Sequence, residues 1–351
     1  MIYEEHIASL PLTIDDISLK LYEQPTSSGF TRTTTEVQLT GDGNTGYGED
    51  VTYTSESHYH LQDAKLTNIL LQDATFDSFS NQVNSIDLFF NESPEQEVYR
   101  NYRQWGFESA ALDLALRQQE ISFGECIART YRPISFVVST RLGDPPSFDR
   151  IARLREMDPT INLKLDPTSD WEQALIDTLA DTHAVKILDF KGLYENSDVE
   201  QAPNADLYQQ IIDRFPNAIL EDPGITDQTR DILTTETHRI SWDYPITDVD
   251  SITERPWKPT WINIKPSRFG SVKTLFDTIE YCQTNRIKMY GGGQFELSIG
   301  RSHLHHLASL FYPDGPNDVA PREYNEPTVK GGLQTSPIDP PTEPNGFSWT
   351  K

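Results

Sequence analysis

Five charged residues lie in, or directly after, short apolar runs in the middle of the sequence. The runs are INLKL with Lys164, VKIL followed by Asp189, AIL followed by Glu221, ISW followed by Asp243, and WINI followed by Lys265. A short apolar run bounded by turn residues is typical of a buried strand in a parallel sheet. Because the carboxyl ends of parallel strands meet at one edge of a sheet or one mouth of a barrel, we expect these charges to share a pocket.

The three acids in this set have the chemistry and the spacing of a metal site. Asp189, Glu221 and Asp243 are separated by 32 and 22 residues, about one strand–helix unit each. Oxygen ligands from neighbouring strand ends suit Mg²⁺, with water and substrate in the remaining positions. Each acid could instead cap the helix that follows its strand. The common register of all three, with a lysine on either flank, favours the metal site.

The lysines stand out because the chain contains only 11 of them. Lys164 lies on the second predicted strand and Lys265 on the sixth, which places the two amines on opposite sides of a closed barrel. An amine in an apolar strand beside a cation has a lowered pKa, as a general base requires. Either lysine could instead form a structural ion pair. Lys191 follows Asp189 by two residues on the same face, so it is a third amine of the site or a partner of that acid.

The elements that position these residues alternate between strand and helix. The alternation begins with a strand at Ile134–Val138 and continues to a helix at about Gly300–Phe311. At least seven strand–helix units in about 180 residues favour a closed α/β barrel over an open sheet.

The first part of the chain has a different pattern. Ile14–Tyr22 and Thr33–Leu39 alternate apolar and polar side chains, as antiparallel strands with one wet face do. Gly41–Gly48 is a turn-rich break, and Phe107–Leu116 has helical apolar spacing. We therefore predict three regions: an α+β domain over residues 1–130, a barrel over 131–312, and an irregular proline-rich tail over 313–351 that packs on the surface, with a return to the α+β domain left open.

The formal net charge of the chain is −25, from 54 acidic and 29 basic residues. This charge argues against nucleic acid and anionic membranes as partners. The acidic excess is dispersed, as in an ordinary acidic enzyme or a protein adapted to high salt. Two cysteines, no signal-peptide pattern at the amino terminus and no apolar run approaching ~18 residues predict a cytoplasmic protein. Assembly into a homo-oligomer is left open.

The same residues resemble the enolase superfamily, in the branch of muconate lactonizing enzyme and mandelate racemase. The matching motifs are INLKLD, ILDF, ILEDP, SWDYPI, NIKPSRFGS, and YGGGQFE followed by SIGRSHLHHLA. The resemblance covers most of the chain and implies a modified TIM barrel, (β/α)7β, with an N-terminal α+β capping domain. It also implies Mg²⁺ held by the three acids, a substrate carboxylate on that ion, and bases Lys164 and Lys265 on opposite faces. The loop near Gln24–Phe30 would help to select the substrate.

Two residues depart from the pattern of that branch. Asn162 stands where the first lysine of a Lys-x-Lys strand is expected, and Lys191 stands where a neutral polar residue is common. Lys191 could replace the charge missing at Asn162, which leaves the reaction class in place and puts the familiar substrates in doubt. Gln294 and Glu296 alternate along the closing strand, where they could touch substrate or pair with Lys265.

Other polar residues give weaker signals. Arg268 could meet an anionic group, but a surface position is the expected one. His303, His305 and His306 lack the i, i+4 pair with an acid that zinc prefers, so surface or packing roles are expected. Gly291–Gly293 matches no phosphate-binding or dinucleotide-binding motif.

The combined pattern predicts a Mg²⁺-dependent lyase or isomerase that removes the proton α to a carboxylate of a small acid and stabilises an enediolate. β-Elimination, cycloisomerisation and racemisation all remain open. One alternative is a glycoside hydrolase barrel with Glu221 and Asp243 as paired carboxylates, although that chemistry needs neither a metal nor two central lysines. Another is a binding protein of this fold without catalysis, which Asn162 and Lys191 keep open.

Overall fold

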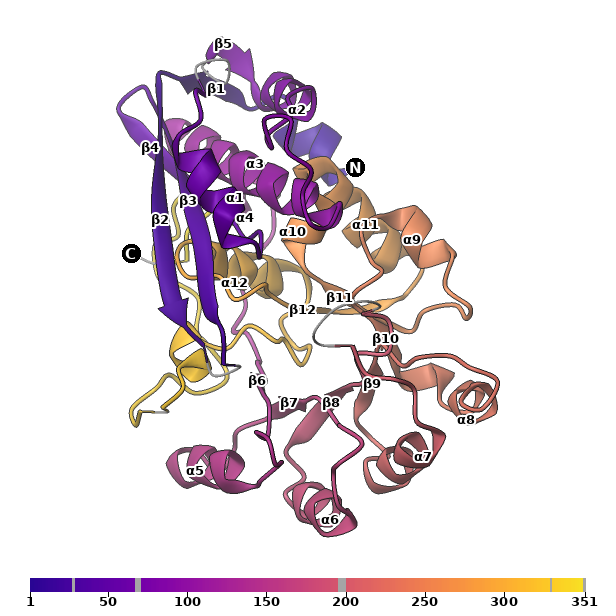
Figure 1. The fold of residues 1–351 in the computed structure, drawn as a ribbon. Helices are drawn as coiled ribbons and strands as arrows, with labels where there is room; N and C mark the ends of the chain where they lie inside the picture. Colours follow the sequence, from indigo (N-terminus) through magenta and orange to yellow (C-terminus); the bar gives the residue numbers. More distant parts are fainter. Residues whose placement is uncertain (27–28, 67–70, 195–199, 329, 350–351) are drawn as a thin grey trace.

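The computed structural model describes residues 1–26, 29–66, 71–194, 200–328 and 330–349. The chain forms an N-terminal α+β domain that packs against an α/β barrel (Figure 1). The predicted fold, a modified TIM barrel preceded by an α+β domain, is confirmed.

The N-terminal domain is built on a three-stranded antiparallel meander with the order β2–β3–β4. β2 (Asp16–Pro25) pairs with β3 (Thr31–Gly41), and β3 pairs with β4 (Asn44–Asp50). The predicted break at Gly41–Gly48 contains the turn between β3 and β4 but is too long, because the turn is confined to Asp42 and Gly43 and the chain then continues as β4. The other elements are a π-helical turn (Tyr3–Ile7), β1 (Pro11–Ile14) paired with β5 (Leu71–Thr75), α1 (Ser55–Gln62), α2 (Phe76–Asn84), α3 (Val98–Gln118) and α4 (Phe123–Cys126).

Glycines in β4 allow α3 to pack directly on the sheet. A Cβ atom at Gly48 would lie 1.9 Å from the carbonyl oxygen of Gly106, and one at Gly46 would lie 2.2 Å from the amide nitrogen of Leu114. Any larger residue would therefore separate helix from strand. This contact fixes α3, whose first turns line a cavity between the N-terminal domain and the barrel.

The barrel wall is a seven-stranded parallel sheet in which each strand pairs with the next along the chain. The strands are β6 (Val138–Thr140), β7 (Leu163–Leu165), β8 (Val185–Asp189), β9 (Ile219–Glu221), β10 (Ile240–Trp242), β11 (Trp261–Ile264) and β12 (Lys288–Gly291). The helices are α5 (Asp149–Met157), α6 (Gln173–Asp181), α7 (Ala205–Arg214), α8 (Arg230–Thr234), α9 (Val249–Thr253), α10 (Pro266–Phe269), α11 (Val272–Thr284) and α12 (Gly300–Phe311), with 3-10 turns at Thr237–Arg239 and Arg322–Asn325. Several of them lie outside the strands in Figure 1.

Residues after α12 occupy the eighth position of the barrel. Asn317 bridges Phe136, just before β6, and Asp318 bridges Gly292, just after β12, both in parallel orientation. The amide N–H of Val137 donates to the Asn317 carbonyl oxygen at 2.8 Å. Part of the segment that we expected as a surface tail therefore lies in the barrel wall.

The C-terminal residues return to the N-terminal domain. Gly346 bridges Ser122, and the fully buried Phe347 ring packs at 5.0 Å from Phe123 and 6.4 Å from Trp105 between ring centres. This contact joins the last residues described to α3 and α4.

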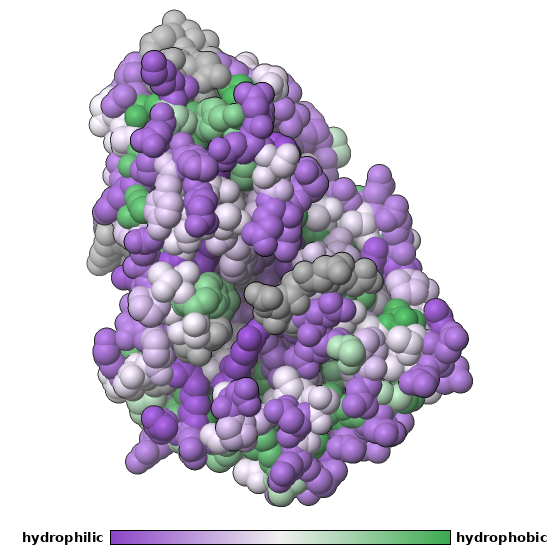
Figure 2. Space-filling model, in the orientation of Figure 1, coloured by the Kyte–Doolittle hydropathy of each residue, from purple (hydrophilic) through white to green (hydrophobic). Residues whose placement is uncertain are grey.

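The outer surface is largely hydrophilic on the face shown in Figure 2. Among the residues that the structure describes, no helix combines the length and apolar character needed to span a membrane.

Candidate active site

The three predicted metal ligands lie together at the carboxyl ends of neighbouring strands. Asp189 and Glu221 end β8 and β9 as register partners, and Asp243 directly follows β10. One carboxylate oxygen of each lies within 4.8 Å of the others, and all three residues are buried. Parallel pairing produces the cluster because it aligns successive strand ends.

Lys164 and Lys265 contact opposite parts of this carboxylate cluster. Lys164 Nζ, from β7, lies 2.5 Å from Glu221 Oε1 and 3.3 Å from Asp189 Oδ2. Lys265, which follows β11, places Nζ 2.8 Å from Asp243 Oδ2. Five consecutive strands thus supply an amine, three carboxylates and a second amine.

The glycines after β12 leave room for this arrangement. A Cβ atom at Gly292 would lie 2.9 Å from Lys265 Cε and 2.5 Å from Asn263 Oδ1. Asn263 is buried and its Nδ2 donates to Glu221 Oε1 at 3.4 Å. Gly292 therefore helps to determine where Lys265 and Asn263 lie.

Lys191 points into the cluster. Its backbone is left-handed, with φ of 52°, and its N–H donates to Asp189 Oδ1 at 3.2 Å. Its Nζ forms an ion pair with Asp189 Oδ2 and lies 4.8 Å from the centre of the Tyr194 ring. Lys191 is both a partner of the acid and a residue lining the adjoining cavity.

The expected surface position of Arg268 is wrong. Arg268 is 3% exposed, and its Nη1 lies 2.9 Å from Asp243 Oδ1. The single turn of α10 reverses the chain after Lys265 and returns Arg268 to the cluster. Its place three residues beyond a candidate base was the only signal in the sequence.

Two tyrosines also hydrogen bond to the carboxylates, and nothing in the sequence marked them. The hydroxyl of Tyr290 donates to Glu221 Oε2 at 2.5 Å, and that of Tyr194 donates to Asp243 Oδ2 at 3.1 Å. Tyr290 belongs to β12 and Tyr194 to the segment after β8. Together they help to fix the orientation of two of the three acids.

Two further acids, Asp222 and Asp318, lie next to the carboxylate cluster and its lysines. Asp222, the acid of the LEDP motif that follows Glu221, accepts the backbone N–H of Asp243 at 2.9 Å and that of Tyr244 at 2.7 Å. Burial, followed by the charges of Asp243 and Asp189, raises the pKa of Asp222 to about 7. Asp318, in the eighth barrel position, places Oδ2 3.5 Å from Lys164 Nζ.

The two lysines differ in their electrostatic surroundings. Burial lowers the pKa of Lys164, but the charges of Glu221 and Asp189 outweigh burial and hold this pKa well above its usual value. At Lys265 burial prevails over the attraction of Asp243 and lowers the pKa. The lowered pKa expected of a base is therefore found at Lys265 only. A cation on the carboxylates would weaken the attraction that raises the pKa of Lys164.

The carboxylate cluster fits a divalent cation. Asp189, Glu221 and Asp243 present oxygen atoms to one point from rigid strand ends, as Mg²⁺ requires, and burial excludes bulk water that would otherwise screen them. The ammonium groups on the same carboxylates are the competitors of such an ion.

A cavity of about 440 Å³ lies between the barrel and the N-terminal domain. Lys164, Lys191, Lys265 and Arg268 line it on the barrel side. A small molecule in the cavity would meet these cations together with the carboxylates of Asp166 and Asp318, whereas Asp189, Glu221 and Asp243 do not line the cavity.

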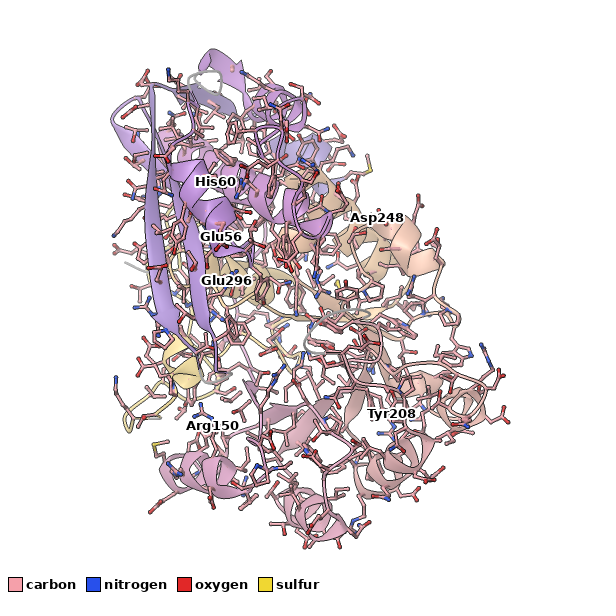
Figure 3. All side chains as sticks on the ribbon, in the orientation of Figure 1. Glu56, His60, Arg150, Tyr208, Asp248 and Glu296 are labelled. Carbon is pink, nitrogen blue, oxygen red and sulfur yellow. The ribbon has the colours of Figure 1, made fainter. Side chains whose placement is uncertain are left out.

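Gln294 and Glu296 lie after β12 rather than along a strand, which ends at Gly291. The Gln294 side chain joins two tyrosines, accepting from the Tyr53 hydroxyl and donating to Tyr102, both at 3.0 Å. Glu296 lies near the junction of the two domains (Figure 3) and pairs with Arg301 at 3.3 Å. Gln294 lines the cavity, whereas the contacts of Glu296 hold the loop.

The three histidines of α12 are packing residues. His303, His305 and His306 are at most 8% exposed, and the His303 ring stacks on Phe347 at 4.3 Å between ring centres. His305 Nε2 contacts the carbonyl oxygen of Val319 at 2.7 Å.

The fold resembles that of solved members of the enolase superfamily. The structure resembles muconate lactonizing enzyme from Pseudomonas putida, with a TM-score of 0.70 and 17% identity over 95% of this chain and 96% of that one. It also resembles a mandelate racemase/muconate lactonizing protein from Herpetosiphon aurantiacus, with a TM-score of 0.68 and 17% identity over 97% and 99% of the two chains. The fold is that of the enolase superfamily, as the motifs predicted.

Sequence comparison gives the particular family. Residues 130–326 match the C-terminal domain, and residues 5–126 the N-terminal domain, of the family described as "Domain of unknown function (DUF8230)". The chain belongs to this family. It is also 24% identical to o-succinylbenzoate synthase of Enterococcus faecalis (strain ATCC 700802 / V583) over 296 residues, which are 80% of this chain and 77% of that protein.

Proposed function

We propose that this protein is a Mg²⁺-dependent lyase or isomerase that removes the proton α to the carboxylate of a small acid. The observation that carries the proposal is the row of Lys164, three buried carboxylates and Lys265 on five consecutive strands. The enolase-superfamily fold, shared with muconate lactonizing enzyme, adds support.

Asp189, Glu221 and Asp243 would hold the ion. When bound, Mg²⁺ supplies positive charge beside the substrate carboxylate and stabilises the enediolate that proton removal creates. Tyr290 and Tyr194 keep two of these carboxylates in place through their hydroxyl groups.

The two lysines would act on opposite faces of the substrate. Lys265, with its lowered pKa, is the better general base because more of it is neutral. Lys164, held charged by its neighbours, can stabilise the negative charge on the enediolate or return a proton. An acid and a base on opposite faces are compatible with racemisation as well as with elimination or cycloisomerisation.

A second candidate function is ligand binding without turnover. It is favoured by the contact of Lys191 with Asp189, because an ammonium group there competes with a metal ion. A glycoside hydrolase has less support, since Glu221 and Asp243 each bond a lysine and a tyrosine instead of lining the cavity.

The test is hydrogen–deuterium exchange at the α carbon. The protein is incubated with Mg²⁺ in D2O with a panel of carboxylic acids, and exchange is followed by proton NMR. We expect exchange with at least one acid, its loss on chelation, and a fall of about 10²–10⁴-fold in Lys164→Ala and Lys265→Ala.

The matched control is Lys186→Ala. Lys186 is an exposed lysine on β8 whose Nζ contacts only the carbonyl oxygen of His183 among the hydrogen bonds described. The Lys186→Ala variant should catalyse α-proton exchange at the wild-type rate. Exchange that persists in both site variants would exclude the proposed roles, and saturable Mg²⁺-dependent binding without exchange would favour the second candidate.

A further inference from the structure

A row of aromatic rings forms part of the lining of the cavity. Adjacent ring centres are 5.5, 6.3, 6.4 and 5.6 Å apart along the row. The five residues, here called the aromatic row, are Phe295, Phe30, Tyr53, Tyr99 and Tyr102. Phe295 comes from the loop after β12 and the other four from the N-terminal domain, so both domains build this wall.

Two of the three tyrosine hydroxyls of this wall bond the same glutamine. The hydroxyls of Tyr53 and Tyr102 both bond the buried Gln294 amide, and the Gln294 carbonyl oxygen accepts from Arg32 Nε at 3.1 Å. The Arg32 guanidinium also lies 4.2 Å from the centre of the Tyr53 ring. A ligand is therefore offered ring surface here, because these polar atoms already have partners.

Charges that line the cavity have ion-pair partners, although the buried Nε of Arg301 has no hydrogen-bond partner among the described residues. Arg301 pairs with Glu296 at 3.3 Å, and Arg141 pairs with Asp166 at 3.5 Å. Among the described lining residues, each charged side chain except Glu95 has an oppositely charged partner, and Glu95 is an exposed acid that accepts from Thr54. Because the cations of the barrel side are paired as well, the aromatic rings themselves distinguish this part of the cavity.

Phe295 has an unusual backbone. Its φ is 56°, a left-handed conformation that bulky residues rarely adopt. The loop is held there because Gln294 N–H donates to Glu296 Oε1 at 2.6 Å and Leu297 N–H donates to Glu49 Oε1 at 2.7 Å. The conformation places the Phe295 ring edge-on against Phe30, at the border of the cavity.

We propose that the cavity takes a carboxylic acid whose far end carries an uncharged apolar ring, seated against the aromatic row. The carboxylate end of this assignment rests on the proposed function, whereas the ring end rests on the row itself. Such an amphipathic ligand matches a pocket that is lined by both cations and aromatic rings. Phe295 and Phe30 are then residues that determine substrate specificity.

The test compares three acids that differ only at the far end. Binding of 3-phenylpropanoate, propanoate and glutarate to the full-length protein with excess Mg²⁺ is measured by titration calorimetry. Burial of the ring predicts that 3-phenylpropanoate binds about tenfold or more tightly than propanoate. If glutarate bound as tightly as 3-phenylpropanoate, or more tightly, the proposal would be overturned, because the cavity would then recognise a charge at the far end of the ligand.

Two variants distinguish ring recognition by the aromatic row from a general effect of lost packing. Phe295→Ala should weaken binding of 3-phenylpropanoate about fivefold to tenfold and leave propanoate unchanged. Phe90→Ala is the matched control, since Phe90 also has a left-handed backbone, with φ of 55°, but is 36% exposed and outside the cavity. An equal loss of affinity for 3-phenylpropanoate and propanoate in Phe295→Ala, with an unchanged melting temperature, would contradict a role of Phe295 in ring recognition.

The experiment distinguishes failure of this inference from failure of the proposed function. Ring-selective binding without α-proton exchange would support this inference and count against catalysis. Exchange with acids of every kind and no preference for a ring would overturn this inference and leave the catalytic proposal standing.

Discussion

Each domain contains a buried cluster of charges, and the two clusters are built differently. In the N-terminal domain, Asp50 pairs with Arg103 at 2.8 Å and lies 3.7 Å from His58. Thr52 donates its N–H and its hydroxyl to Asp50, and Arg103 donates to the carbonyl oxygens of two other residues. In the barrel, three acids lie within 4.8 Å of one another, with lysines that face a cavity.

The two clusters differ in how their charges are balanced. The N-terminal cluster pairs one acid with one arginine, satisfies both through the backbone, and does not line the cavity. The barrel cluster gathers like charges that repel each other unless cations lie between them. Folding alone gives little reason for such an arrangement, whereas binding of a cation and an anionic substrate does.

The largest expected effect is on stability, in the N-terminal cluster. Arg103→Met should lower the free energy of unfolding by about 3–5 kcal/mol, because it leaves Asp50 buried without its partner. Urea denaturation measures the change. Arg100→Met is the control, since Arg100 is 42% exposed in its ion pairs and should lose at most about 1 kcal/mol. Similar losses in the two variants would remove the contrast between buried and surface pairs.

A buried acid that has no cationic partner among the described residues should affect the pH dependence of stability in the opposite way to Asp50. Burial raises the pKa of Glu108 to about 7, although the Val272 N–H and two side chains donate to it. Between pH 4.5 and 7 the folded state keeps a proton that the unfolded state releases, so stability should fall as pH rises, by up to roughly 3 kcal/mol. Glu108→Gln should remove this part of the pH dependence, as measured by denaturation from pH 4.5 to 8. Parallel profiles for wild type and variant would contradict the assignment.

A methyl group at Gly292 should disturb the barrel cluster specifically. Gly292→Ala places Cβ against Lys265 and Asn263, and such overpacking costs about 1–3 kcal/mol. Where exchange is observed for the wild type, we expect a loss of about tenfold or more in α-proton exchange. Gly331→Ala, at an exposed glycine with no atom within 4 Å of a built Cβ, should change nothing. If Gly292→Ala exchanged the α proton at the wild-type rate, Lys265 would not need the position that it has beside Gly292.

The smallest expected effect concerns metal affinity. Lys191→Asn removes an ammonium group that competes for Asp189, so Mg²⁺ should bind about tenfold more tightly, which is about 1.4 kcal/mol. Titration calorimetry with Mg²⁺ alone measures the change, with Lys186→Asn as the exposed control. Equal or weaker binding in Lys191→Asn would mean that this amine does not compete with the ion.

Strand periodicity made the barrel and the positions of its three acids predictable from the sequence. Asp189, Glu221 and Asp243 end apolar runs in register, so parallel pairing alone brings them together. The roles of these acids and of the lysines stay predictions. Arg268 and Asp318 could not be found in this way, because one depends on a single helical turn and the other on a long return of the chain after α12. The aromatic row could not be found either, since it forms only where two domains meet.

The return of the chain after α12 bears on how the protein is made. Asn317 and Asp318 complete the barrel wall, and Phe347 is buried against α4 of the N-terminal domain, although all three are synthesised after α12. Domains of many proteins fold in order during synthesis. Here neither domain can reach its final packing until the residues after α12 have been made, so the order of synthesis does not set the order of folding.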